Sequence, residues 1–97
     1  MPTTNPLTIP SPENLDFTVY IKSRCPYCTK VKALLDSTNI KTKYINTDPY
    51  ISDAISKEQF LNYIQQITGK RHRTFPIVFF DAELVGGYTE TQWFINH

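Results

Sequence analysis

The sequence has little of several features that mark special classes of protein. It has only two cysteines in 97 residues, too few for a secreted domain held together by disulfides. No apolar run approaches the roughly 20 residues that span a bilayer, and the N-terminus lacks the basic-then-apolar pattern of a secretory signal. The net charge of +1 gives no general attraction to nucleic acid or membrane, so we expect neither as a partner. We expect one small domain in a reducing, cytoplasmic setting.

Proline is scarce outside one region of the chain. Residues 1–14 hold four of the seven prolines, and proline is excluded from helix interiors and from central strands. We therefore interpret residues 1–14 as an extended N-terminal extension and residues 15–97 as the folded domain.

The remaining residues alternate between strand-like and helix-like patterns. Strands are expected at 17–23, 43–46, 76–81 and 84–85, and helices at 26–38, 56–69 and 89–96. The second helix is expected to start with a capping box of Ser56 and Gln59 and to end at Gly69 as its C-terminal cap. The third helix is expected to start with Thr89 as its N-terminal cap. A strand–helix–strand start implies parallel pairing, and the tight turn near residue 82 implies an antiparallel final pair. The predicted fold is α/β and thioredoxin-like, a four-stranded mixed central sheet flanked by helices on both faces.

The two cysteines stand three positions apart in R-C-P-Y-C-T, residues 24–29. A structural zinc site needs four ligands, and only two distant histidines, His72 and His97, could complete it. Covalent haem attachment needs a histidine directly after the second cysteine, where Thr29 stands. A structural disulfide over so short a loop would constrain little of the unfolded chain. The pattern also allows Cys28 to be an inert thiol in the core, because it shares a helical face with apolar residues.

A redox interpretation gives each thiol a different role. Cys25 directly precedes the expected helix, whose free N–H groups and macrodipole stabilise an anion. With Lys22 and Arg24 nearby, its pKa is expected to fall from about 8.5 into the range of roughly 3.5–7.5. Cys28 is one turn further on and faces inward, so it can resolve a mixed disulfide at Cys25. Pro26 makes the turn between them rigid.

Two further motifs are independent of the cysteines. Pro76 starts a strand, and a cis bond before it would leave the backbone N–H and C=O of Phe75 ready to pair with an extended peptide. The alternative is an ordinary trans proline. Gly86 and Gly87 precede a helix, whose N-terminus can receive a carboxylate. The alternative is a turn that simply needs glycine.

Together these motifs resemble the dithiol class of the glutaredoxin family. The resemblance rests on V-Y-I-K-S-R-C-P-Y-C-T-K (19–30), N-Y-I-Q-Q-I-T-G (62–69), R-T-F-P-I-V-F-F (73–80) and V-G-G-Y-T-E (85–90). It implies a glutathione-dependent thiol–disulfide oxidoreductase, with glutathione as reductant and no metal. The implied partners are glutathionylated or disulfide-containing proteins, with ribonucleotide reductase one candidate among many. The default oligomeric state is a monomer.

The resemblance also implies roles for individual residues. Cys25 is the nucleophile and Cys28 the resolving thiol, so the pair forms the redox-active disulfide. Cations would attract the glycine carboxylate of glutathione, the residue before the proline would pair with its backbone, and the glycine turn would hold its γ-glutamyl end. The implied glutathione-binding set is Lys22, Tyr27, Arg73, Thr74, Phe75, Pro76, Gly87, Tyr88 and Thr89.

The chain departs from the family pattern in four places. Phe75 stands where a small branched residue is usual, and Leu61 stands where a glutamine contact is frequent. The loop 70–73 is longer than the common pattern and leaves open which arginine meets the ligand. The chain stops soon after Trp93, so we expect Trp93 and Phe94 to cover the core.

Two other functions are considered. A dimer could bridge an iron–sulfur cluster, each protomer supplying Cys25 and a glutathione, but Pro26 argues against it because the cluster binders of the family tend to lack that proline. A thioredoxin-like electron donor is the second alternative, against which Lys22, Arg73 and the glycine pair favour glutathione.

Overall fold

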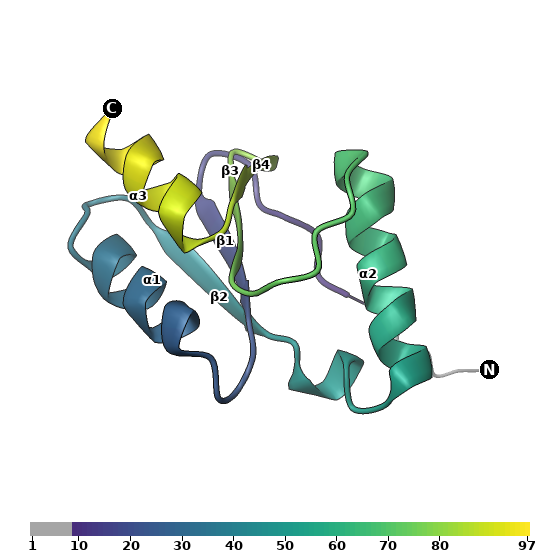
Figure 1. Ribbon diagram of the computed structural model, residues 1–97. Coiled ribbons are helices and arrows are strands. Elements are labelled where there is room, and N and C mark those ends of the chain that lie inside the picture. Colours follow the sequence, from purple (N-terminus) through teal and green to yellow (C-terminus); the bar gives the residue numbers. More distant parts are fainter. Residues whose placement is uncertain (1–8) are drawn as a thin grey trace.

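The computed structural model describes residues 9–97 of the chain (Figure 1). The elements are, in chain order, β1 (Phe17–Ile21), α1 (Pro26–Asp36), β2 (Thr42–Asn46), the 3₁₀ turn η1 (Asp48–Tyr50), α2 (Ala54–Thr68), β3 (Ile77–Phe80), β4 (Glu83–Gly86) and α3 (Tyr88–Asn96). This order of strands and helices is the predicted one. The N-terminal part of the predicted extension, residues 1–8, lies outside the described residues.

The strands form one sheet in the order β2-β1-β3-β4. β1 pairs with β2 in parallel, whereas the β1–β3 and β3–β4 pairs are antiparallel. The predicted mixed sheet of four strands is therefore confirmed. β1 and β3 lie in the middle of the sheet, and most of their side chains are buried on both faces.

Helices cover both faces of the sheet, as Figure 1 shows: α1 and α3 lie on one face and α2 on the other. Phe60, Leu61 and Ile64 of α2 pack with Tyr20 and Phe79 in one core cluster. The face of α1 and α3 has a second cluster, made by Phe17, Val19, Val31, Leu35 and Val78. Fully burying a side chain of this size stabilises the fold by about 1.5–3 kcal/mol. Within residues 9–97, no helix has the length and apolar character that a membrane crossing requires.

The start of α2 differs from the prediction. Asp53 is the N-terminal cap, and its Oδ1 accepts a hydrogen bond of 2.8 Å from the backbone N–H of Ser56. Ser56 thus lies inside the first turn, and the expected capping box of Ser56 and Gln59 is wrong. Hydrogen bonding to the Ser56 N–H lowers the pKa of Asp53 because it stabilises the carboxylate. The predicted cap at the other end is confirmed, since Gly69 has the left-handed φ of 76°.

The start of α3 also differs from the prediction. Gly87 is the cap, and its backbone N–H donates to Oε1 of Glu90 at 2.8 Å. Because the carboxylate three residues along the helix reaches back to this N–H, the cap does not need a hydroxyl side chain. Thr89 lies inside the first turn, so its predicted role as the cap is wrong.

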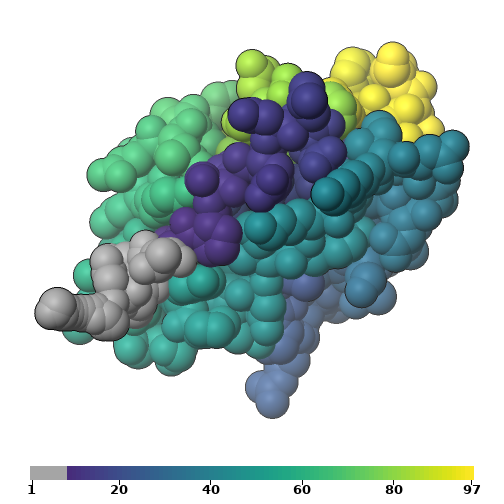
Figure 2. Space-filling model, turned by 180° about the vertical axis from the view of Figure 1, so that it is seen from behind, coloured from purple at the N-terminus to yellow at the C-terminus, as the bar shows by residue number. Residues whose placement is uncertain are grey.

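The described part of the N-terminal segment lies across the sheet domain. Figure 2 shows it in purple on the surface, beside α2. Ile9 belongs to the core cluster of α2, and the Tyr20 hydroxyl donates to the Pro10 carbonyl at 2.6 Å. Glu13 forms an exposed ion pair of 3.2 Å with Lys43. The segment is therefore attached through one apolar side chain and several polar contacts.

Trp93 does not cover the core as expected. Its side chain is 63% exposed, and its ring stacks on His97 with the centroids 4.3 Å apart. Phe94 is 40% exposed and covers the core in part, because its ring contacts the buried Phe17 and also Phe80, with centroids 6.1 Å and 5.5 Å apart. The two aromatic residues of α3 thus leave apolar surface open beside β4.

Candidate active site

The sheet topology brings the three sequence motifs to one end of the molecule. Cys25 follows the end of β1, and because β3 runs antiparallel to β1, Pro76 at the start of β3 lies at the same end. β4 runs antiparallel to β3, so Gly87, which follows β4, returns there too. Motifs up to 62 residues apart in the sequence therefore form one site.

The cysteine pair has the predicted asymmetry. Cys25 is the N-terminal cap of α1, and its Sγ lies 3.1 Å from the backbone nitrogen of Cys28. Pro26 occupies the start of the helix, where its missing N–H leaves no hydrogen bond unmade. Cys25 is half-buried, whereas Cys28 is buried with 5% of its surface exposed. The two sulfurs form a disulfide, and the Cα atoms are 5.1 Å apart.

The bond between Phe75 and Pro76 is cis, as predicted. The Phe75 carbonyl oxygen lies 3.7 Å from Sγ of Cys25, so the backbone before the proline contacts the more accessible sulfur. The Phe75 side chain turns towards the α2 core, where its ring stacks on Phe60 with centroids 5.9 Å apart and an interplanar angle of 17°. The unusual aromatic residue at this position is therefore accommodated mainly by core packing.

A pocket of about 430 Å³ adjoins this backbone and is rich in cations. The predicted residues Lys22, Arg73, Thr74 and Phe75 line it together with Ile51 and Lys57. Lys57 was missed in the sequence. Lys57 lies one helical turn before Leu61 on α2, and this spacing does not distinguish it from other exposed cations. Leu61 itself is 1% exposed and belongs to the core.

The structure separates the two arginines of the loop 70–73. The Arg71 guanidinium donates to Oδ1 of Asn62 at 2.7 Å and to Oε1 of Gln65 at 3.1 Å, and it pairs with the Glu58 carboxylate. All three partners lie on α2, so Arg71 ties the loop to that helix. Arg73 lines the cationic pocket instead and is exposed to solvent.

An aromatic pair lies between the starts of α1 and α3. The Tyr27 and Tyr88 rings are 5.8 Å apart, and Nζ of Lys30 lies 5.2 Å from the Tyr27 centroid. Gly87 comes close to the proline turn, since a Cβ added there would lie 3.7 Å from the Pro76 carbonyl oxygen. The tyrosine pair thus lies beside the start of α1 and Gly87 lies beside Pro76, whereas Thr89 lines a separate groove with Trp93.

The described part of the chain contains no group of three His, Cys, Asp or Glu side chains placed to hold a metal ion. The groups that the structure does bring together at the site are two sulfurs, a cationic pocket and the backbone before Pro76.

Comparisons with known proteins agree with this geometry. The glutaredoxin family model matches residues 17–85. Glutaredoxin-1 of Bos taurus is 40% identical over 73 residues, which are 74% of this chain and 65% of the bovine protein, so the chain spans somewhat less than two thirds of that relative. The crystal structure of glutaredoxin 1 from Francisella tularensis in complex with cacodylate has a TM-score of 0.67 at 25% identity, over 84% of this chain and 98% of that chain.

A glutathione complex is also among the similar structures. The buckwheat glutaredoxin–glutathione complex has a TM-score of 0.64 at 26% identity, over 82% of this chain and 67% of that chain. The fold is thus thioredoxin-like, and the disulfide of Cys25 and Cys28 fits a dithiol motif. The family model covers well over half of the chain, and this chain therefore belongs to the glutaredoxin family.

Proposed function

We propose that this protein is a glutathione-dependent thiol–disulfide oxidoreductase that reduces glutathionylated proteins and protein disulfides. The observation that carries the proposal is the arrangement of the two sulfurs. A half-buried Cys25 caps the start of α1 and is disulfide-bonded to a buried Cys28 one turn later. The family match and the similar glutathione complex support glutathione as the reductant.

The reduced form of the site is built to hold a thiolate at Cys25. The Cys28 backbone N–H points at its Sγ from 3.1 Å, and the start of a helix carries a partial positive charge. Both features favour the anionic sulfur, which is the nucleophile in thiol exchange. Cys28 has no such position, because it lies inside the helix and is buried.

With a glutathionylated protein, the Cys25 thiolate attacks the glutathionyl sulfur. The bond between Cys25 and glutathione forms as the disulfide to the protein breaks, and the protein leaves as a thiolate that takes a proton from water. A second glutathione thiolate then attacks the glutathionyl sulfur on Cys25. Glutathione disulfide leaves, and the Cys25 thiolate is restored.

With a protein disulfide, the Cys25 thiolate attacks one substrate sulfur. The substrate disulfide breaks, and its other sulfur leaves as a thiolate that takes a proton from water, so that a mixed disulfide remains at Cys25. The Cys28 thiolate then attacks Sγ of Cys25, which releases the second substrate thiol and forms the disulfide seen in the structure. Two electrons have passed to the substrate. Two glutathione molecules return the pair to the dithiol form and leave as glutathione disulfide.

The glutathione-binding residues carried over from the family divide into two groups around Cys25. Lys22, Arg73 and Thr74 line the cationic pocket, where they would bind a carboxylate. The Phe75 backbone would pair with the peptide portion of the ligand, since its carbonyl already lies beside Sγ. Tyr27, Gly87 and Tyr88 would contact the other end, beside Pro76, with Thr89 one position further along α3. Lys57 joins the cationic group, for a total of three cations in one pocket.

A coupled assay tests the proposal. NADPH consumption is followed with glutathione, glutathione reductase and a glutathionylated small disulfide. We expect turnover by the wild type, none by Cys25→Ser, and retained deglutathionylation by Cys28→Ser with loss of protein-disulfide reduction. Absence of NADPH consumption by the wild type would refute the proposal. A Cys28→Ser variant as inactive as Cys25→Ser on a glutathionylated substrate would refute the monothiol step.

The findings do not favour the two alternatives. The disulfide between Cys25 and Cys28, together with the family match, supports thiol exchange over an iron–sulfur dimer. Anaerobic purification with a visible absorbance band would favour the cluster. The three cations in the pocket beside Phe75, whose carbonyl oxygen lies 3.7 Å from Sγ of Cys25, support glutathione over a reductase-coupled thioredoxin-like donor. Ribonucleotide reductase as a substrate, a role in electron transport, the cytoplasmic location and the monomeric state stay predictions.

A further inference from the structure

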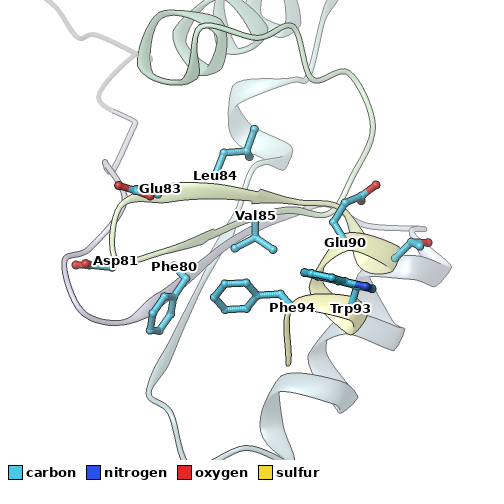
Figure 3. Close-up of a pocket in the computed structure, with 9 residues that line it drawn as sticks. Phe80, Asp81, Glu83, Leu84, Val85, Glu90, Trp93 and Phe94 are labelled. Atoms are coloured by element: carbon cyan, nitrogen blue, oxygen red, sulfur yellow. The ribbon is translucent and has the colours of Figure 1, made fainter. Parts of the chain in front are cut away.

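A second hollow lies along β4, outside the cationic pocket. It has a volume of about 580 Å³ and lies between the edge of β4 and α3. Figure 3 shows its apolar floor, where Phe80, Val85, Trp93 and Phe94 point towards a common space beneath the strand. Leu84 points to the opposite face of β4 but also lines the hollow, so the groove reaches around the outer edge of the strand.

The rim of this groove is acidic. Asp81 and Glu83 lie at one end and Glu90 at the other, with the apolar floor between them (Figure 3). These are three of the nine acidic residues in the sequence, and no lysine or arginine lines the groove. Among residues 9–97, none of the three carboxylates is in an ion pair. The groove therefore presents negative charge at both ends of an apolar surface.

The strand beside the groove has an unpaired edge. β4 is the last strand in the order β2-β1-β3-β4 and pairs only with β3 among the described residues. The outer N–H and C=O groups of such a strand can pair with another extended segment, whose alternate side chains then fill neighbouring pockets. Trp93 at 63% exposure supplies a large aromatic surface for such a segment.

We propose that this groove binds an extended peptide segment of a partner protein, with apolar side chains in its centre and a lysine or arginine at each end. The acidic rim selects the cations, the floor of Val85 and Phe94 receives the apolar side chains, and the edge of β4 receives the backbone. A second copy of this chain fits poorly, because a symmetric contact would place the three carboxylates of each copy against each other.

The groove is connected to the redox site through the contacts of Gly87. Glu90 at the rim accepts the Gly87 N–H at 2.8 Å, and Gly87 lies beside the Pro76 carbonyl. A segment held in the groove would thus place the rest of its protein near Cys25. If the proposed redox function holds, the groove favours protein substrates that carry such a segment. Binding in the groove itself needs no redox chemistry.

The probe is a heptapeptide, acetyl-Lys-Thr-Val-Phe-Val-Thr-Lys-amide. In an extended conformation its two lysines and two valines share one face, which matches the acidic ends and apolar floor. Trp93 is the only tryptophan of the chain and lines the groove, so its fluorescence reports binding. We expect a saturable change, and binding about tenfold tighter than for the peptide with glutamates in place of both lysines. The same peptide N-methylated at its three central residues should also bind about tenfold more weakly.

Matched variants locate the peptide. Glu83→Gln should weaken binding about threefold, and added salt should weaken it further, whereas Glu13→Gln, on the N-terminal segment, should leave it unchanged. Equal binding of the lysine and glutamate peptides, or no saturable change at millimolar peptide, would overturn the proposal. So would a concentration-dependent change in Trp93 fluorescence without peptide, because it would assign the groove to a second copy. If the protein fails the coupled redox assay but binds the peptide, the proposed redox function is refuted and the proposed peptide site in the groove is supported.

Discussion

Replacing each arginine of the basic loop in turn separates a structural role from a ligand-binding role. Arg71 contacts three side chains of α2, yet its side chain is 28% exposed and its partner Glu58 is 56% exposed. Exposed ion pairs contribute about 0.2–1 kcal/mol, and a small domain loses about 4–8 °C of Tm per kcal/mol. Arg71→Met should therefore lower Tm by about 1–8 °C.

Arg73→Met should have the opposite effect: it should lower kcat/KM and leave Tm nearly unchanged. Arg73 lines the cationic pocket and would donate a charge-assisted hydrogen bond to a ligand carboxylate. Such bonds contribute about 1.5–3 kcal/mol, and solvent exposure reduces this to about 1–2 kcal/mol, which corresponds to a fall in kcat/KM of about 5–30-fold. Because Arg73 makes no hydrogen bond or ion pair with another residue of the range 9–97, Tm should stay within about 1 °C of the wild type.

The assay combines thermal unfolding by circular dichroism with the coupled glutathione assay on both variants. Raised KM with unchanged kcat is expected for Arg73→Met, since the lost contact is made in the ground state as well as the transition state. If Arg71→Met lost more kcat/KM than Arg73→Met at a temperature where both are folded, the assignment of the two arginines would be wrong. A double variant should show additive effects if the two roles are independent.

Three further predictions follow from single contacts. Lys57→Met should lower kcat/KM about two- to fivefold in the coupled assay, whereas Lys41→Met, an exposed cation elsewhere, should not. Asp53→Ala should lower Tm near neutral pH. Because the pKa of Asp53 is lowered in the folded state, its stabilisation is present above about pH 4 and is lost as pH falls through the lowered pKa. The difference in Tm between the variant and the wild type should therefore shrink in acid. Phe60→Ala should cost about 3–5 kcal/mol in urea unfolding, because Phe60 is fully buried and stacks on Phe75; a loss below 1 kcal/mol would contradict that packing.

Most of the fold was predictable from the sequence because its signals are local. Apolar and β-branched runs marked β1 and β3, Pro26 marked the start of α1, and Gly69 marked the end of α2. The N-terminal caps of α2 and α3 were misassigned. Several polar residues compete for free N–H groups at a helix start, and backbone geometry, which a sequence does not display, decides among them.

The parts of the site that could be predicted are those in which a residue type and its spacing allow few structural roles. Two cysteines three positions apart and a proline before a strand left few alternatives, and the structure places both motifs together. Lys57 was missed and the two arginines were not distinguished, because a lysine or arginine on an exposed turn has the same appearance whether it binds a ligand or a neighbouring helix. Only the distances from Arg71 to α2 separate the two cases.

The position of each motif within the sheet sets how firmly it is held. Cys25 follows β1 and Pro76 precedes β3, and these two strands are paired on both sides and buried on both faces. Gly87 follows β4, which is paired on one side only in the part of the chain that the structure describes. Amide hydrogens of β1 and β3 should therefore exchange with solvent far more slowly than those of β4. We therefore expect the sulfur-bearing half of the site to be the more rigid one, and the backbone at Gly87 to adjust more readily to the shape of a ligand.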